Sequence, residues 1–568
     1  MQRKRKSGRR RRDGGRAGGA VPHPGPREAP GRPSPALAGG GARGPRPSPV
    51  LAGLLPAVLL LVGPAGAVRG QEPPGGSAAR AEGRGPDYEA VRGWVRDHRA
   101  AILRRLVELV SIPDVAADTG GLRRNAAWIR SALEQRGVRV RLIEAGGPPL
   151  VVGWLPHPGA TRTILFYAHY DGQPVDPARW EWSAPFEPTL RDGSPASDPA
   201  VLPMPAAGDA VPAGARLYGR AAADDRGPIV ALLAALDALR AQGAAPAANL
   251  RFVFEGEEEA GSPHFERALR EHADELRADL AIVVDGPRHP SGRPTVTFGA
   301  RGITTAAVTV YGPARPLHSG HYGNWAPNPA ERLARLIASM QDSTGRVAIA
   351  GWYDDVRPLG EAERRALADL PSDSAEAVRL LVPRPEVPES RWAAVTEPSL
   401  NVDGIRSGWT GSEARTIIPD RATANFDFRL VAGIDPGEQL RRFLAHIRSR
   451  GYHVVQDEPG REERLAHPKL ARVTLGTGYP AVRTDIDAPA ARALVASVRE
   501  AQGKDLVLIP TMGGSVPGYL FPRLLGASFV ALPIVNHDDN QHSPDENLLL
   551  SDLFDGVVSL TAAMETTW

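Results

Sequence analysis

Three stretches of the chain decide its fold: residues 163–172 read TILFYAHYDG, residues 250–261 read LRFVFEGEEEAG, and residues 280–286 read LAIVVDG. In each, a short apolar run passes directly into acidic or imidazole side chains. The apolar runs do not alternate with polar residues, which is typical of strands buried on both faces of a sheet. They are interspersed with helical patterns, so we predict an α/β fold with a mixed, largely parallel sheet flanked by helices.

The neighbouring sequence extends this fold in both directions. A helical pattern runs from Asp87 toward Pro113, and further helices are expected over 125–136, 227–241 and 487–502. Further strands are predicted at 138–142, 150–154 and 506–509. Residues 191–214 are rich in Pro and Ala and are predicted to form a surface loop.

The segment 301–480 has a different character. A strand is expected at 303–311 before a helix that begins at Asn328-Pro329, and an alternating strand at 424–430 before a helix that begins at Asp435-Pro436. This repeat predicts a smaller inserted α+β domain, a lid or dimerisation domain. The predicted divisions are a leader with signal peptide, a flexible linker, a first catalytic segment, the lid and a second catalytic segment, at 1–67, 68–86, 87–300, 301–480 and 481–568.

The formal charge of +3 is unevenly distributed. Residues 1–47 carry 13 Lys and Arg against only Asp13 and Glu28, whereas the other 521 residues carry 55 basic and 63 acidic side chains. A basic chain suggests a nucleic-acid partner, but the body of this protein is acidic. We therefore expect no nucleic-acid binding.

The apolar run 50–62 (VLAGLLPAVLLLV) follows the basic leader and precedes Ala65-Gly66-Ala67. This order indicates a secretory signal peptide cleaved near Ala67, which predicts a secreted or periplasmic protein. The alternative is an uncleaved membrane anchor. The run is short compared with the roughly 20 apolar residues that span a bilayer, so we expect no stable membrane insertion of the mature chain.

The chain contains no cysteine, so any metal must be held by His, Asp or Glu. Such residues follow the predicted strands, where an open α/β sheet binds its ligands. Each cluster alone has an ordinary explanation, because acids suit a helix start and a single histidine is usually structural. Here, however, His, Asp and Glu residues follow several apolar runs that are predicted to be buried strands, and this recurrence favours a metal site.

The motifs together resemble the co-catalytic zinc metallopeptidase family, which includes carnosinase-type dipeptidases, glutamate carboxypeptidase, aminoacylase and succinyl-diaminopimelate desuccinylase. The matching motifs, in order, are His169-x-Asp171, Tyr218-Gly219-Arg220 with Asp224-Asp225-x-Gly-Pro, Glu255-Gly-x-Glu258-Glu259-x-Gly-Ser, Asp285, Leu317-His318-Ser319-Gly320 and His542-Ser-Pro-x-Glu. The resemblance implies the same two-domain fold and a homodimer formed through the lid.

The resemblance also implies a site for two divalent metal ions, with zinc favoured and manganese or cobalt as alternatives. Asp224 would bridge the ions, His169 and Asp285 would complete one set, and Glu259 and His542 the other. Carboxylate and imidazole are suitable zinc ligands, and two ions bridged by a carboxylate can activate water. In the family the peptide bond matching Asp224–Asp225 is cis.

Further roles follow from the same resemblance. Glu258 matches the general base that activates a metal-bridging water, and Asp171 matches the residue that orients His169. His318 matches a lid residue that stabilises the oxyanion, often in the partner subunit. The residues that match substrate-binding positions are Arg429, Gly514 and Ser515.

The predicted function is hydrolysis of dipeptides or short peptides with a free C-terminal carboxylate. An N-acyl-amino-acid deacylase with the same metal site is the alternative, and an inactive peptide-binding homologue is less favoured because the ligands and Glu258 are intact. Two departures from the family pattern are Ala221, where Gly is usual, and Arg226, where Lys is usual.

Overall fold

The computed structural model describes residues 87–372, 374, 378, 380–382, 390–503 and 505–568. All of them belong to one compact unit, Ala81–Trp568. The predicted basic leader, signal peptide and linker all lie outside the described residues. Within the described ranges, no helix is both long enough and apolar enough to cross a membrane.

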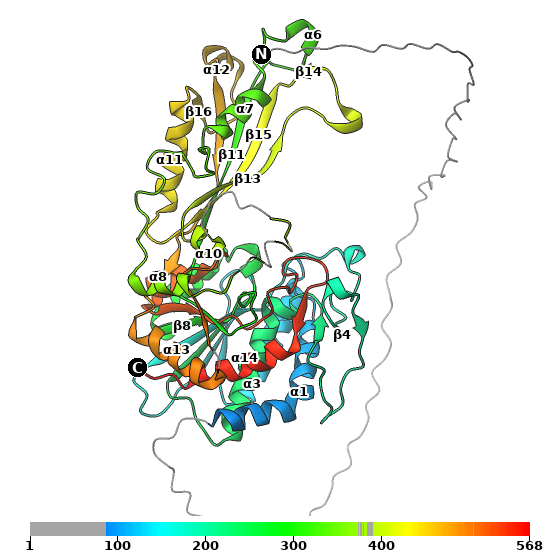
Figure 1. Ribbon diagram of the computed structural model, residues 1–568, viewed down its shortest axis with the longest axis vertical. Coiled ribbons are helices and arrows are strands. Elements are labelled where there is room, and N and C mark those ends of the chain that lie inside the picture. Colours follow the sequence, from blue (N-terminus) through cyan, green and yellow to red (C-terminus); the bar gives the residue numbers. More distant parts are fainter. Residues whose placement is uncertain (1–86, 373, 375–377, 379, 383–389, 504) are drawn as a thin grey trace, which may run out of the picture. The chain divides into compact units, whose positions relative to one another are not determined.

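A mixed eight-stranded sheet forms the centre of the catalytic domain (Figure 1). In spatial order its strands are β1 (Arg139–Ile143), β2 (Leu150–Leu155), β7 (Asn249–Glu255), β3 (Thr163–His169), β8 (Leu280–Val283), β20 (Ser528–Ala531), β9 (Thr295–Thr297) and β19 (Val507–Ile509). The four central strands β7, β3, β8 and β20 are parallel to one another. Their carboxyl ends therefore meet at one edge of the sheet.

Both faces of this sheet are covered, which explains the unbroken apolar sequence of its strands. Ile164 and Phe166 of β3 pack into one core, and Leu165 and Tyr167 into the core on the other face. The larger core is covered by α1 (Tyr88–Val110), α2 (Thr119–Glu134), α3 (Gly227–Ala241), α13 (Pro489–Gln502) and α14 (Leu550–Met564). The smaller core is covered by α4 (Phe265–Glu271), α5 (Ala273–Leu276) and the turn η7 (Phe521–Leu525). The predicted α/β fold is confirmed.

The segment predicted as an insertion contains a separate five-stranded sheet with its own core. Its strands, in spatial order, are β13 (Ser399–Arg406), β15 (Arg421–Leu430), β11 (Gly302–Tyr311), β17 (Leu470–Leu475) and β16 (His453–Val455). Helices α7 (Pro329–Ala338) and α11 (Pro436–Ser449) begin where their caps predict, because Asn328 accepts a bond from the Ala330 amide and Asp435 one from the Glu438 amide.

The chain enters and leaves this segment through paired strands, β10 (Gly299–Ala300) and β18 (Val482–Arg483). The smaller elements within the segment are β12 (Leu317–His318), α6 (Ser319–Tyr322), α8 (Glu361–Ala368), α10 (Arg391–Ala394), η5 (Gly411–Glu413), β14 (Ile417–Ile418) and α12 (Arg461–Ala466). We call residues 301–480 the lid. The domain boundaries stay a prediction.

Two local predictions were wrong. Helix α2 begins at Thr119 and not at 125, because Asp118 caps it by accepting a bond from the Gly121 amide. Residues 191–214 are not wholly a loop, since they contain the end of β4 and all of β5. The sheet to which these belong consists of β21 (Asn547–Leu549), β6 (Ala215–Tyr218), β4 (Thr189–Asp192) and β5 (Ala200–Val201). Short turns complete the catalytic domain: η1 (Pro177–Arg179), η2 (Pro195–Ser197), η3 (Ala222–Arg226), η4 (Glu258–Ala260) and η6 (Pro517–Tyr519).

Candidate active site

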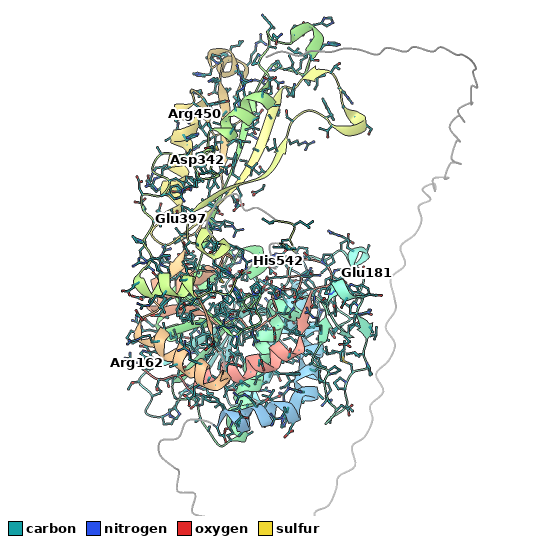
Figure 2. The ribbon with its side chains drawn as sticks, viewed as in Figure 1. Arg162, Glu181, Asp342, Glu397, Arg450 and His542 are labelled. Carbon is teal, nitrogen blue, oxygen red and sulfur yellow. The ribbon has the colours of Figure 1, made fainter. Side chains whose placement is uncertain are left out.

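The parallel strands bring the predicted site residues to one edge of the central sheet. His169 ends β3 and pairs in register with Glu255 at the end of β7, while Asp285 follows β8. The loop that carries His542 approaches the same edge from the C-terminal region of the chain (Figure 2). This convergence is the geometry that open α/β sheets use for ligand binding.

Asp224 lies between the two histidines. Its Oδ1 is 2.9 Å from His169 Nε2 and its Oδ2 is 3.1 Å from His542 Nε2. His542 Nε2 is also 3.3 Å from Glu259 Oε2. The Asp224–Asp225 peptide bond is cis, as the resemblance predicts. One carboxylate therefore faces two separate imidazoles, as a bridging ligand would.

Two groups of side chains could each hold a metal ion. One consists of His169, Asp225 and Asp285, and the other of Asp224, Glu259 and His542. The five predicted ligands all lie in these groups. Asp225 was not predicted as a ligand; its Oδ2 accepts a bond from the His169 amide, and its Oδ1 is buried without a hydrogen-bond partner.

The charges of this cluster favour cations. Burial raises the pKa of Asp285 to about 6 and that of Glu259 to about 7. Burial would also raise the pKa of Asp224, but hydrogen bonds from both histidines hold it well below its usual range. The bond to Asp224 raises the pKa of His542 to about 9. Carboxylates gathered away from water are stabilised by divalent cations, so the donors fit two such ions.

Glu258 lies beside this cluster without belonging to either group. Burial raises its pKa well above the usual range for a carboxyl group, as a general base near neutral pH requires. Asp171 fixes the turn that carries it, because its carboxylate accepts bonds from the amides of Glu258 at 3.1 Å and Glu259 at 3.0 Å. His169 Nδ1 lies 3.1 Å from the Asp171 carbonyl and 3.4 Å from its carboxylate.

Sequence reasoning missed several polar side chains that hold the site together. Gln541 Nε2 donates to Asp224 Oδ2 at 2.6 Å, and Gln173 Nε2 donates to Glu259 Oε2 at 2.7 Å. Glu546 is buried and accepts bonds from the amides of the loop that ends at Asp224. Of these three residues, only Glu546 could have been identified from the sequence, because it is the last residue of the His542-Ser-Pro-x-Glu motif.

The substrate-binding residues predicted from the resemblance line a cavity of about 450 Å³ beside the cluster. Arg429 Nη1 donates to Ser515 Oγ at 3.0 Å, and Arg429 Nε donates to Asp427 at 3.1 Å. Gly514 accepts a bond from the Arg301 amide. The same cavity is lined by Glu258, Asp224, Asp285 and His542, so an arginine and the metal cluster face one space.

His318 is not brought to this cavity. It is exposed on the lid, where its Nδ1 accepts a bond from the Gly320 amide at 3.0 Å and its ring lies 4.6 Å from that of His321. It does not line the cavity within the region of the chain that the structure describes. Its predicted role in catalysis stays a prediction.

Two adjacent groups of candidate metal ligands, a buried acid and an arginine around one cleft are the features of a metal-dependent hydrolase. Residues 165–566 match the profile of Peptidase family M20/M25/M40, and the chain belongs to this family. The resemblance drawn from the motifs is thus confirmed.

Several of the relatives that the chain matches are dipeptidases or carboxypeptidases. The Cys-Gly metallodipeptidase DUG1 of Candida albicans is 26% identical over 498 residues, covering 82% of this chain and 94% of the relative. Human Beta-Ala-His dipeptidase is 26% identical over 484 residues, covering 81% of this chain and 86% of the relative. Among solved structures, the M20 family metallo-carboxypeptidase Sso-CP2 of Sulfolobus solfataricus has a TM-score of 0.66 and 28% identity, covering 82% of this chain and 98% of that one.

Proposed function

We propose that this enzyme hydrolyses the peptide bond of dipeptides that carry a free C-terminal carboxylate. The observation that supports this substrate class is the placement of Arg429 and Ser515 in the same cavity as Glu258. A guanidinium and a hydroxyl can bind a carboxylate together. Two of the relatives named above are dipeptidases and one is a carboxypeptidase, which favours the same class.

The described residues have distinct roles in the proposed reaction. Arg429 and Ser515 hold the substrate carboxylate and so orient the scissile bond toward Glu258. Glu258 takes a proton from the attacking water and delivers it to the leaving amine, for which its raised pKa is suited. Two divalent cations held by the two ligand groups would supply Lewis acidity to the carbonyl and the water. Zinc suits a donor set of carboxylate and imidazole.

The assembly and location of the protein are further elements of the proposal. His318 lies outside the cavity in a single chain, which supports a homodimer in which the lid of one subunit contributes to the site of its partner. The leader and the apolar run at 50–62 support export with cleavage near Ala67. These residues lie outside those that the structure describes.

The test is a parallel assay of the zinc-loaded protein against dipeptides and N-acetyl amino acids. We expect dipeptide turnover that falls by roughly a thousandfold or more in Glu258→Gln. The matched control is Glu257→Gln, since Glu257 is the adjacent acid but bonds to His264 instead. The control should keep wild-type turnover.

Each other outcome has a defined meaning. Turnover of N-acetyl amino acids alone would replace the proposal with a deacylase. No turnover with both metal sites filled would leave a peptide-binding protein. Equal rates for Glu258→Gln and the wild type would show that the base is another residue.

A further inference from the structure

Part of the lining of the active-site cavity is apolar and has no role in the reaction described above. Its walls are formed by Pro287, Pro290, Trp392, Ile509 and Met512. They come from three separate segments: the loop after β8, the lid helix α10, and the end of β19 with the loop that follows it. A cluster of apolar side chains beside a catalytic acid is a candidate pocket for a substrate side chain.

Trp392 is fixed in this wall by contacts on both sides of α10. Its ring stacks on that of buried His289, with centroids 5.3 Å apart and planes inclined by 30°. The Ser390 hydroxyl caps the helix by accepting a bond from the Ala393 amide at 3.2 Å. After the helix, Arg301 donates to the Glu397 carbonyl at 2.7 Å. The indole is therefore part of a preformed surface.

The apolar wall adjoins the predicted carboxylate-binding residues. Val395, which follows α10, lies against the loop that carries Ser515, since a side chain added at Gly513 would meet Val395 at 3.7 Å. The carboxylate and the side chain of a C-terminal residue leave the same Cα atom. A substrate whose carboxylate is held by Arg429 and Ser515 would thus place that side chain near the apolar wall.

A second cavity that Glu258 lines differs in character. Glu258 and Ser515 also line a second cavity of about 300 Å³, in which Tyr479, Tyr519 and Glu266 are the other prominent side chains. The cavity that contains Arg429 therefore includes an apolar wall, whereas the second cavity at Glu258 is lined mainly by acidic and tyrosine side chains and small loop residues. This asymmetry gives a dipeptide a defined direction, with its C-terminal residue in the apolar region.

We propose that the enzyme selects dipeptides whose C-terminal residue has a large apolar or aromatic side chain, which Trp392, Ile509 and Met512 receive. This inference rests on the proposed dipeptidase function. Two arginines also line the cavity: Arg288 is paired with Asp552 at 3.3 Å, and the Arg391 guanidinium lies 4.4 Å from the centroid of the Trp392 ring. An acidic C-terminal side chain is therefore the competing preference against which the apolar one is tested. Burying such a side chain should raise kcat/KM roughly ten- to a hundredfold over glycine.

The experiment compares kcat/KM of the zinc-loaded full chain for Ala-Phe, Ala-Leu, Ala-Glu and Ala-Gly. Ala-Phe and Ala-Leu should exceed Ala-Gly by the stated factor, mainly through KM. Trp392→Ala should reduce the ratio of Ala-Phe to Ala-Gly by roughly fivefold or more. The matched control Trp568→Ala should keep the wild-type ratio, because Trp568 does not line the cavity. Met512→Ala is the second variant if Trp392→Ala does not fold.

A binding measurement separates this inference from the proposed function. Calorimetry with Glu258→Gln should show tighter binding of Ala-Phe than of Ala-Gly, whether or not the wild type turns either over. Tighter Ala-Phe binding without turnover would overturn the dipeptidase and keep the pocket. Three results would overturn the pocket. They are equal kcat/KM values for Ala-Phe and Ala-Gly, a higher kcat/KM for Ala-Glu, or a ratio of Ala-Phe to Ala-Gly that is unchanged in both Trp392→Ala and Met512→Ala. If the protein neither binds nor hydrolyses these dipeptides, both the proposed function and the proposed pocket are overturned.

Discussion

Glu546 is not a candidate metal ligand, but it determines the position of one, Asp224. Its carboxylate accepts bonds from Arg220 Nη1 at 2.7 Å and from the amides of Ala221, Ala223 and Asp224, each at 3.0 Å. These bonds occupy both oxygens of Glu546 and fix the backbone just before Asp224, the candidate bridging ligand. The loop would otherwise have buried amides without acceptors, which is costly.

We predict that Glu546→Gln weakens metal binding by roughly ten- to a hundredfold. An amide offers one acceptor oxygen in place of two and turns an NH₂ group toward backbone donors, so the loop and Asp224 must shift. Zinc affinity measured by competition with a chelator checks this. Glu271→Gln, at an exposed position on α4, is the control and should bind zinc as the wild type does. Equal zinc affinity in Glu546→Gln would show that the loop holds its shape unaided.

These contacts mark the limit of what the sequence could predict about the site. The sequence could predict that His169 and Asp285 lie at one edge of the sheet, because His169 is the last residue of β3 and Asp285 comes two residues after the end of β8, and both strands have strongly apolar sequences. Asp225 was assigned no role, and Gln541 escaped prediction, because their importance depends on which side chains face them in space. Gln541 is 317 residues from its partner Asp224 in the chain, and no local pattern expresses such a contact.

At the scale of secondary-structure elements, the start of a helix was predicted correctly where its N-cap side chain bonds to an amide a few residues further along the chain. Asn328 and Asp435 each bond to an amide within three residues, so their helices could be located from sequence. The start of α2 was missed because Gly120 and Gly121 suggest a loop, whereas the Asp118 cap and tertiary packing make them helical. Strand β5 was missed because its pairing with β4 depends on the fold of the intervening chain.

The C-terminal end of α14 carries a largely buried carboxylate, whose charged form is therefore destabilised. Glu565 caps the C-terminus of this helix, its Oε1 is buried without a hydrogen-bond partner, and burial raises its pKa to about 7. The unfolded chain would ionise at the ordinary value of 4.5. Between these two pH values the folded state holds more protons than the unfolded state, so this group lowers stability as pH rises.

We therefore predict that Glu565→Gln stabilises the protein in a pH-dependent way. The gain in free energy of unfolding should be absent below about pH 4.5, grow toward pH 7 and remain at about 1–2 kcal/mol above it. Denaturant unfolding of both proteins at pH 5 and pH 8 measures it. The exposed acid Glu500 on α13 gives the control Glu500→Gln, with a change below about 0.5 kcal/mol at either pH. A gain that is equal at both pH values would contradict the burial argument.

At the scale of the whole molecule, the candidate metal ligands come from distant segments of the chain. His169 ends β3, Glu259 follows β7, Asp285 follows β8, and His542 belongs to the C-terminal loop that leads into β21. Cations bound at this junction would link the central strands to the end of the chain. Without them these carboxylates are buried without compensating charge, and burial, followed by the charge of Asp224, raises the pKa of Asp285 and of Glu259.

We predict that chelation lowers the melting temperature and that two equivalents of zinc restore it. A ligand that binds only the folded state at about a thousand times its Kd adds about 4 kcal/mol, which should raise the melting temperature on the order of 5 °C. Calorimetry of the chelated and reloaded protein measures both the shift and the stoichiometry. Asp224→Asn keeps the shape of the bridging side chain but loses its charge, so its melting temperature should respond much less to zinc. Saturation at one equivalent would contradict the two-ion site, and an equal response in Asp224→Asn would show that the stabilising cations bind elsewhere.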